Sequence, residues 1–112
     1  MQLQDEKIGN VLVVKPLEKR MDATVAVDFK EKMAGLINAG NDLIVLDLSA
    51  VSFMDSSGLG AMVSSLKMLG RKGDLVVSGV HQTVMSMFKL TRMDRVFRIF
   101  SNQDEAVAAL AV

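Results

Sequence analysis

Several residue types that build catalytic and metal sites are absent or scarce in this chain. Its 112 residues contain no cysteine, tryptophan or tyrosine, and a single histidine, His81. Without cysteine the chain forms neither disulfides nor thiolate metal sites, which is compatible with a reducing compartment. Histidine and tyrosine are common general acids and bases, so their scarcity argues against an enzyme.

The sequence also lacks an excess of either charge and a long apolar run. Thirteen basic residues balance thirteen acidic ones, so no overall field attracts nucleic acid or an anionic membrane. No apolar stretch approaches the roughly 18 residues that span a bilayer, and the polar start MQLQDEKIGN does not resemble a signal peptide. We therefore expect a cytoplasmic protein that binds neither nucleic acid nor membranes and holds no cofactor or metal.

What is present is a composition suited to one packed domain over residues 1–112. Half of the residues are hydrophobic and 23% are charged, as in ordinary globular proteins. Short runs rich in Val, Leu and Ile, bounded by polar residues or glycine, predict buried strands. These runs occupy residues 10–17, 42–49 and 74–80, and a further short strand is predicted at 95–100.

Helical spacing of apolar residues predicts helices between these strands. The predicted helices cover residues 22–40, 59–69 and 82–90. Asn102, with Glu105 three residues later, predicts a capped start for a fourth helix. The alternation indicates an α/β domain with a mostly parallel sheet of four to five strands and about four helices.

A polar segment, SFMDSSGLG at residues 52–60, lies between a predicted strand and a predicted helix. In open α/β sheets, functional residues gather where strands end and helices begin. A Ser or Asp at such a junction caps the helix by accepting bonds from its free N–H groups. Either Ser56 or Ser57 fits the cap, and spacing alone does not separate them.

This segment does not match three catalytic motifs. A P-loop needs a lysine directly after its glycines, and the next lysine is Lys67. A hydrolase elbow needs a glycine two residues before the serine, which neither serine has, and His81 would be the sole candidate base. A phosphoaspartate receiver using Asp47 or Asp55 needs an acidic pair after its first strand, which this chain lacks.

A serine that another protein phosphorylates is the remaining interpretation. The phosphate would add about −1.5 to −2 charges beside Asp55. Its charge would weaken the binding of a docked partner that presents an acidic or apolar surface. Such a switch requires no change of fold.

The segment VSFMDSSGLGAMV (51–63) resembles the signature of the STAS domain in bacterial anti-sigma factor antagonists. In that family the pattern Asp-Ser-Ser/Thr-Gly-Leu/Val-Gly joins the third strand to the second helix. The upstream VLDLSAVSF, Asp22 before the first helix, and the downstream GDLVVSGV and MFKLTRMDRVFRIF follow the family's order. The resemblance covers essentially the whole chain and implies a STAS fold.

The resemblance also implies a regulator. The unphosphorylated antagonist binds an anti-sigma factor, which then releases its sigma factor. The anti-sigma factor is commonly a serine kinase that inactivates the antagonist by phosphorylating the first serine of the motif, here Ser56. A metal-dependent serine phosphatase reverses this step, so ATP and metal ions belong to the partners. The alternative is a STAS partner-switching protein that controls a secretion, motility or signalling component.

The resemblance assigns further residues to partner binding. Asp22 corresponds to an acid that supports kinase recognition, although Lys19 stands where the family usually has glycine, so we expect a less tightly turned backbone there. Ser57 is expected to make local hydrogen bonds, with a second phosphate as the alternative. The remaining expected partner-binding residues are Met21, Met54, Asp55, Gly58 and Leu59.

Two surface features are left open at this stage. Met21 and Met54 predict an adaptable partner-facing patch, whereas Leu59 fits the core or the partner equally well. Lys89, Arg92, Arg95 and Arg98 recur every three residues and would form a basic ridge on a helix, which we interpret as a solvated face. Whether the free chain forms a weak homodimer is not decided by the sequence.

Overall fold

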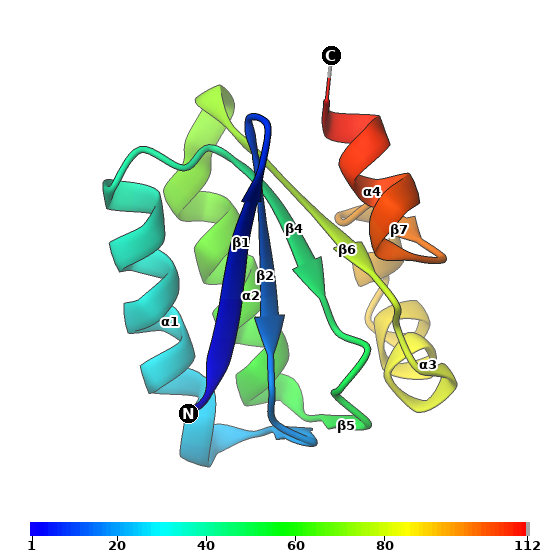
Figure 1. The fold of residues 1–112 in the computed structure, drawn as a ribbon. Helices are drawn as coiled ribbons and strands as arrows, with labels where there is room; N and C mark the ends of the chain where they lie inside the picture. The colour runs from blue at the N-terminus through cyan, green and yellow to red at the C-terminus, as the bar shows by residue number, and fades with distance from the viewer. Residues whose placement is uncertain (112) are drawn as a thin grey trace.

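A five-stranded mixed sheet forms the centre of the structure, in the order β1–β2–β4–β6–β7 (Figure 1). The computed structural model describes residues 1–111. β1 pairs with β2 antiparallel, and the other three pairs are parallel. The strands are β1 (Leu3–Ile8), β2 (Val11–Pro16), β4 (Leu43–Asp47), β6 (Asp74–Ser78) and β7 (Ile99–Phe100). The predicted mostly parallel sheet is confirmed.

Successive side chains of the central strands enter two different cores. On β2, Leu12 and Val14 pack in the larger core, and Val11 and Val13 pack in the smaller one. The same alternation runs along β4 and β6. Because side chains of a strand point alternately to the two faces, both faces of the sheet must be covered by helices.

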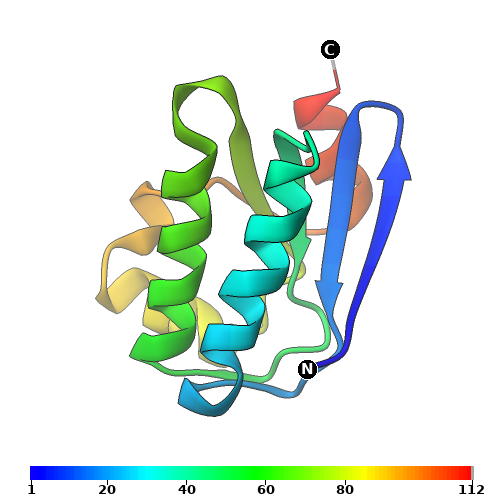
Figure 2. The ribbon, with the colours of Figure 1, turned by 90° about the vertical axis from the view of Figure 1, so that its left-hand side faces the viewer.

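Two helices cover one face of the sheet and a third covers the other (Figures 1 and 2). α1 and α2 lie side by side over the larger core, and α4 packs over the smaller core. α3 buries Val84 and Phe88 in the larger core. The helices are α1 (Ala23–Asn38), α2 (Ser56–Leu69), α3 (Gln82–Leu90) and α4 (Gln103–Leu110), with short 3-10 turns η1 (Gly70–Lys72) and η2 (Met93–Arg95). The predicted helices and the Asn102 cap are confirmed.

A second, two-stranded ribbon connects the sheet to the starts of α1 and α2. It consists of β3 (Arg20–Met21) and β5 (Phe53–Met54), which pair in parallel. Each strand leads directly into a helix, so the ribbon holds the two helix N-termini together. Strands of two residues have no hydrophobic period, and the sequence therefore did not predict them.

The stretch 95–100 differs from its prediction as a strand. Only Ile99–Phe100 is extended, and it follows the turn η2. Phe97 is buried with its ring centroid 6.1 Å from that of Phe88, so packing against α3 bends the chain inward before β7 begins. The basic residues from Lys89 to Arg98 therefore do not form one helical ridge.

Candidate functional site

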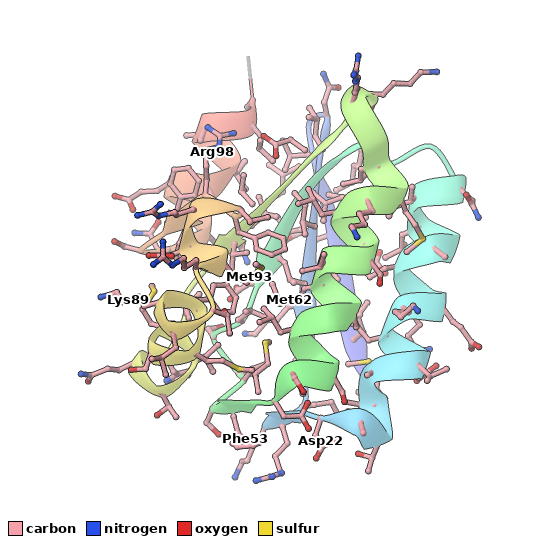
Figure 3. All side chains as sticks on the ribbon, turned by 180° about the vertical axis from the view of Figure 1, so that it is seen from behind. Asp22, Phe53, Met62, Lys89, Met93 and Arg98 are labelled. Carbon is pink, nitrogen blue, oxygen red and sulfur yellow. The ribbon has the colours of Figure 1, made fainter. Side chains whose placement is uncertain are left out.

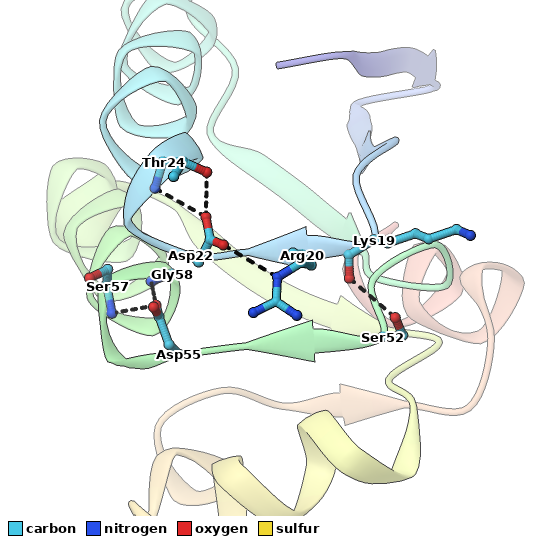
Figure 4. A network of polar contacts seen from close by, with 8 residues as sticks. All are labelled: Lys19, Arg20, Asp22, Thr24, Ser52, Asp55, Ser57 and Gly58. Carbon is cyan, nitrogen blue, oxygen red and sulfur yellow. Dashed lines mark hydrogen bonds and ion pairs between the residues drawn. The ribbon is translucent and has the colours of Figure 1, made fainter.

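The N-termini of α1 and α2 meet at the β3–β5 ribbon, and each is capped by a carboxylate (Figure 4). Asp55 Oδ1 accepts hydrogen bonds from Ser57 N at 2.9 Å and Gly58 N at 3.1 Å. Asp22 Oδ1 accepts one from Thr24 N at 3.0 Å. These bonds satisfy N–H groups that a helix leaves free in its first turn. The expected serine cap of α2 is therefore wrong, because Asp55 takes that position.

Ser56 is the first residue of α2 and is exposed to solvent. Within residues 1–111, neither its hydroxyl nor that of Ser57 makes a hydrogen bond. Ser57 is half-buried and contributes its backbone N–H to the cap. Of the two serines, Ser56 is the more exposed residue, and its position is fixed by the cap beside it.

Gly58 allows α2 to approach β3 closely. A Cβ atom at residue 58 would overlap the backbone carbonyl of Met21 and would lie 3.0 Å from the Met21 Cβ. The same carbonyl accepts a hydrogen bond from Asp55 N at 3.3 Å, so it cannot move freely. Gly58 is buried and thus positions the neighbouring cap and serine; it offers no side chain to a partner.

Three further expected partner-binding residues belong to the core. Met21, Met54 and Leu59 are only 0%, 5% and 7% exposed. The two methionines are register partners on the ribbon and point toward the larger core, as does Leu59 on α2. The predicted methionine patch on the surface is therefore wrong, since the alternation of the ribbon turns these side chains inward.

Arg20 and Phe53 occupy the outer side of the ribbon, next to the two caps. They are register partners, and the Arg20 guanidinium lies 4.0 Å from the centroid of the Phe53 ring. Arg20 Nε is also 3.4 Å from Asp22 Oδ2, and its side chain is 62% exposed. Sequence reasoning missed both residues, because their pairing depends on a ribbon that has no sequence signal.

Local hydrogen bonds keep Asp22 ionised. The Thr24 hydroxyl, which donates to Asp22 Oδ1 at 2.5 Å, is the main cause that lowers the pKa of Asp22 below 3.8. Desolvation is the second-largest effect and raises the pKa, while the Thr24 backbone N–H and Arg20 lower it further. Asp22 therefore presents a fixed negative charge beside Arg20 at neutral pH.

Lys19 fits its position without the glycine that the family usually has there. Its carbonyl accepts hydrogen bonds from Ser52 N at 2.9 Å, Phe53 N at 3.0 Å and Ser52 Oγ at 3.3 Å. Among non-glycine residues of the described chain, only Arg92 has a positive φ. Lys19 therefore does not adopt the left-handed conformation that would require glycine, and the ribbon anchors it through its carbonyl.

Two candidate catalytic residues form structural contacts elsewhere. Asp47 is buried, and its carboxylate accepts hydrogen bonds from Ser49 N and Gln103 Nε2, each at 2.9 Å. His81 Nε2 lies 2.6 Å from the Ser49 carbonyl oxygen. No group of three or more metal-ligating side chains occurs in residues 1–111. The helices of that part of the chain are also too short or too polar to cross a membrane.

Comparisons with known proteins agree on one family. The sequence model of the STAS domain matches residues 2–106. The chain is 33% identical over 70 residues to the anti-sigma F factor antagonist of Paenibacillus polymyxa, a match that covers 62% of this chain and 60% of that protein, less than two thirds of its length. It is 30% identical over 86 residues to the anti-sigma-B factor antagonist of Listeria monocytogenes, covering 76% and 75%.

The fold agrees with the sequence match. A crystal structure of an anti-sigma factor antagonist from Mycobacterium paratuberculosis superposes with a TM-score of 0.90, covering 99% of this chain and 94% of that one at 23% identity. At this identity the likeness concerns the fold alone. The family match over nearly the whole chain and the α/β architecture together establish that this chain belongs to the STAS domain family.

Proposed function

We propose that the chain is an anti-sigma factor antagonist whose partner binding is switched off by phosphorylation of Ser56. The observation that carries the proposal is the exposed hydroxyl of Ser56, which lacks a hydrogen bond in the described chain and stands at a helix start fixed by the Asp55 cap. Relatives of the chain bear the name anti-sigma factor antagonist. The chain would act in the cytoplasm as the substrate of a kinase, with no catalysis of its own.

The exposed groups around Ser56 form the proposed recognition surface. Asp22 offers an ionised carboxylate, and Arg20 offers a guanidinium that lies 4.0 Å from the centroid of the Phe53 ring. Arg20 belongs to the ribbon that leads into α1 and α2, and Asp22 directly follows it as the cap of α1, so we expect a partner that contacts both residues to reach Ser56. Met21, Met54, Gly58 and Leu59 support this surface from beneath, and Asp55 and Ser57 supply the cap.

The phosphate would act on the partner through its charge. The start of α2 favours the phosphate by about 0.3–1 kcal/mol. A carboxylate ~5 Å away, such as that of Asp55, opposes it by about 3 kcal/mol per unit charge at an effective dielectric constant of about 20. A penalty of this size at an interface with an acidic or apolar partner weakens binding about a hundredfold. The fold itself need not change.

The cycle requires two enzymes. An anti-sigma factor with serine kinase activity transfers the γ-phosphoryl group of ATP to Ser56 and releases the modified chain. A metal-dependent serine phosphatase hydrolyses the phosphoester and restores binding. In this proposal ATP and the metal ions are held by these partners.

A phosphorylation assay with a matched control tests this proposal. The partner kinase, captured from lysate of the source organism, is incubated with ATP and the wild-type, Ser56→Ala or Ser57→Ala chain, and phosphate is located by mass spectrometry. We expect modification of the wild type and of Ser57→Ala, followed by release of the kinase. Phosphate on Ser56→Ala with the same loss of binding would overturn the assignment.

The target of the captured partner distinguishes an anti-sigma factor antagonist from a partner-switching protein with another target. An anti-sigma factor carries a sigma factor, so the captured kinase should bring down a sigma factor when the unphosphorylated chain is depleted. Recovery of a secretion, motility or signalling component in its place would favour the alternative partner-switching function.

A further inference from the structure

The end of α3 and the turn η2 form a surface that the Ser56 switch does not use. We call it the α3–η2 surface, and it consists of Lys89, Leu90, Arg92, Arg95 and Val96. Leu90 is 86% exposed and Val96 is 47% exposed. Figure 3 shows Lys89 and Arg98 on the same side of the molecule, away from α1. Aliphatic side chains exposed among cations distinguish this surface from a purely solvated one.

The cations of this surface have no partners within the described chain. Lys89, Arg92 and Arg95 are exposed and form no ion pair in residues 1–111. Arg98 differs, because its guanidinium binds Asp74 Oδ2 at 2.8 Å. Asp94 is the one acidic residue between Lys89 and Val96, so the surface is locally positive in a chain whose total charge is balanced.

Arg92 is held in a backbone conformation that suits glycine better. Its φ and ψ are 62° and 21°, in the left-handed region that side chains with a Cβ rarely adopt. Its N–H donates to the Lys89 carbonyl at 3.2 Å, and its carbonyl accepts from Arg95 N at 3.2 Å. The exposed side chain contributes nothing to the core, so folding alone gives no reason for arginine here.

We propose that the α3–η2 surface binds an acidic protein segment that also carries an aliphatic side chain. Carboxylates of the segment pair with Lys89, Arg92 and Arg95, while its aliphatic group packs on Leu90 and Val96. An isolated cation cluster would also suit nucleic acid, but the five residues include no aromatic side chain on which a base could stack. Three cations and two aliphatic side chains fall short of the signals that stable membrane binding requires. The proposal goes beyond the Ser56 switch and does not depend on it.

A designed peptide tests the chemistry without a known partner. The probe is a fluorescent helical peptide of leucine and glutamate with leucine along one face, and the comparison peptide has lysine in place of glutamate. We expect the acidic peptide alone to bind, with NMR shift changes confined to α3, η2 and their neighbours, and with affinity that falls as salt rises. Ser56 phosphorylation is not involved, so this result is independent of the proposed switch.

Variants of the surface make the test specific. Arg92→Gly relieves the left-handed strain, so its thermal midpoint should be no lower than that of wild type. The variant also removes a cation, so it should bind the acidic peptide more weakly. Arg95→Glu combined with Arg92→Gly should weaken binding about tenfold, since exposed ion pairs contribute modestly each. The matched control is Lys72→Glu on η1, which should bind like wild type.

Four outcomes would overturn the proposal. The first two are that the acidic peptide binds no better than its lysine counterpart and that its NMR changes map away from α3 and η2. Equal binding by the double variant would equally contradict it. Tighter capture of the chain by phosphatidylserine vesicles than by the acidic peptide would assign this surface to membranes instead.

Discussion

Replacing Gly58 by alanine perturbs the contact on which the geometry of the candidate site depends. The new Cβ atom would overlap the Met21 carbonyl of β3, and the Met21 carbonyl carbon would lie only 2.9 Å away. Both neighbours are backbone atoms, so no rotamer change relieves the overlap. Either α2 or the ribbon must shift, and the caps of both helices shift with it.

The expected magnitude is the difference between two opposing effects. Overpacking of this kind costs about 1–3 kcal/mol. An overlap between a Cβ atom and a backbone carbonyl lies near the upper end of this range, because neither atom can move by a side-chain rotation. Alanine regains about 1 kcal/mol over glycine inside a helix. The net loss is therefore about 2 kcal/mol, which for a chain of this length lowers the thermal midpoint by about 8 °C.

Gly60→Ala is the matched control in the same helix. A Cβ atom at residue 60 meets nothing within 4 Å, so only the gain in helix propensity remains. Thermal unfolding followed by circular dichroism should show Gly60→Ala at or above the wild-type midpoint and Gly58→Ala well below it. If both variants unfold at the wild-type midpoint, the close approach of α2 to β3 is not what requires glycine at residue 58.

Two further predictions concern side-chain contacts. The lowered pKa of Asp22 means that its charged form stabilises the fold above pH 3.8 and that this contribution disappears as pH falls through the lower folded pKa. The stability difference between wild type and Asp22→Asn, measured by urea titration, should therefore be largest near neutral pH and vanish in acid. A difference that does not depend on pH would contradict the assignment. Gln103→Ala leaves buried Asp47 Oδ2 without its donor on α4, at a cost of about 1–3 kcal/mol in urea unfolding. The exposed Gln82→Ala should change stability by less than about 0.5 kcal/mol, and equal effects of the two alanines would show that the Asp47 contact is unimportant.

Much of the fold was predictable because it follows from local periodicity. Runs of Val, Leu and Ile with polar borders marked β2, β4 and β6, and helical spacing marked α1, α2 and α3. The Asn102 cap of α4 was predicted from a side chain and a spacing alone. Failures occurred where long-range packing decided the conformation, as at 95–100, where burial of Phe97 against Phe88 replaced most of a predicted strand with a turn.

The amino-acid sequence by itself determined the fold class and the position of the motif at a strand–helix junction, and its resemblance to the STAS family indicated Ser56 as the candidate switch residue. Tertiary structure alone decided which side chains surround that serine. The β3–β5 ribbon pairs residues distant in the chain, and its alternation turns Met21 and Met54 inward and leaves Arg20 and Phe53 outside. The physical reason is that a two-residue strand has no period of its own, so its register and its exposed face are set by the partner strand and by the core beneath.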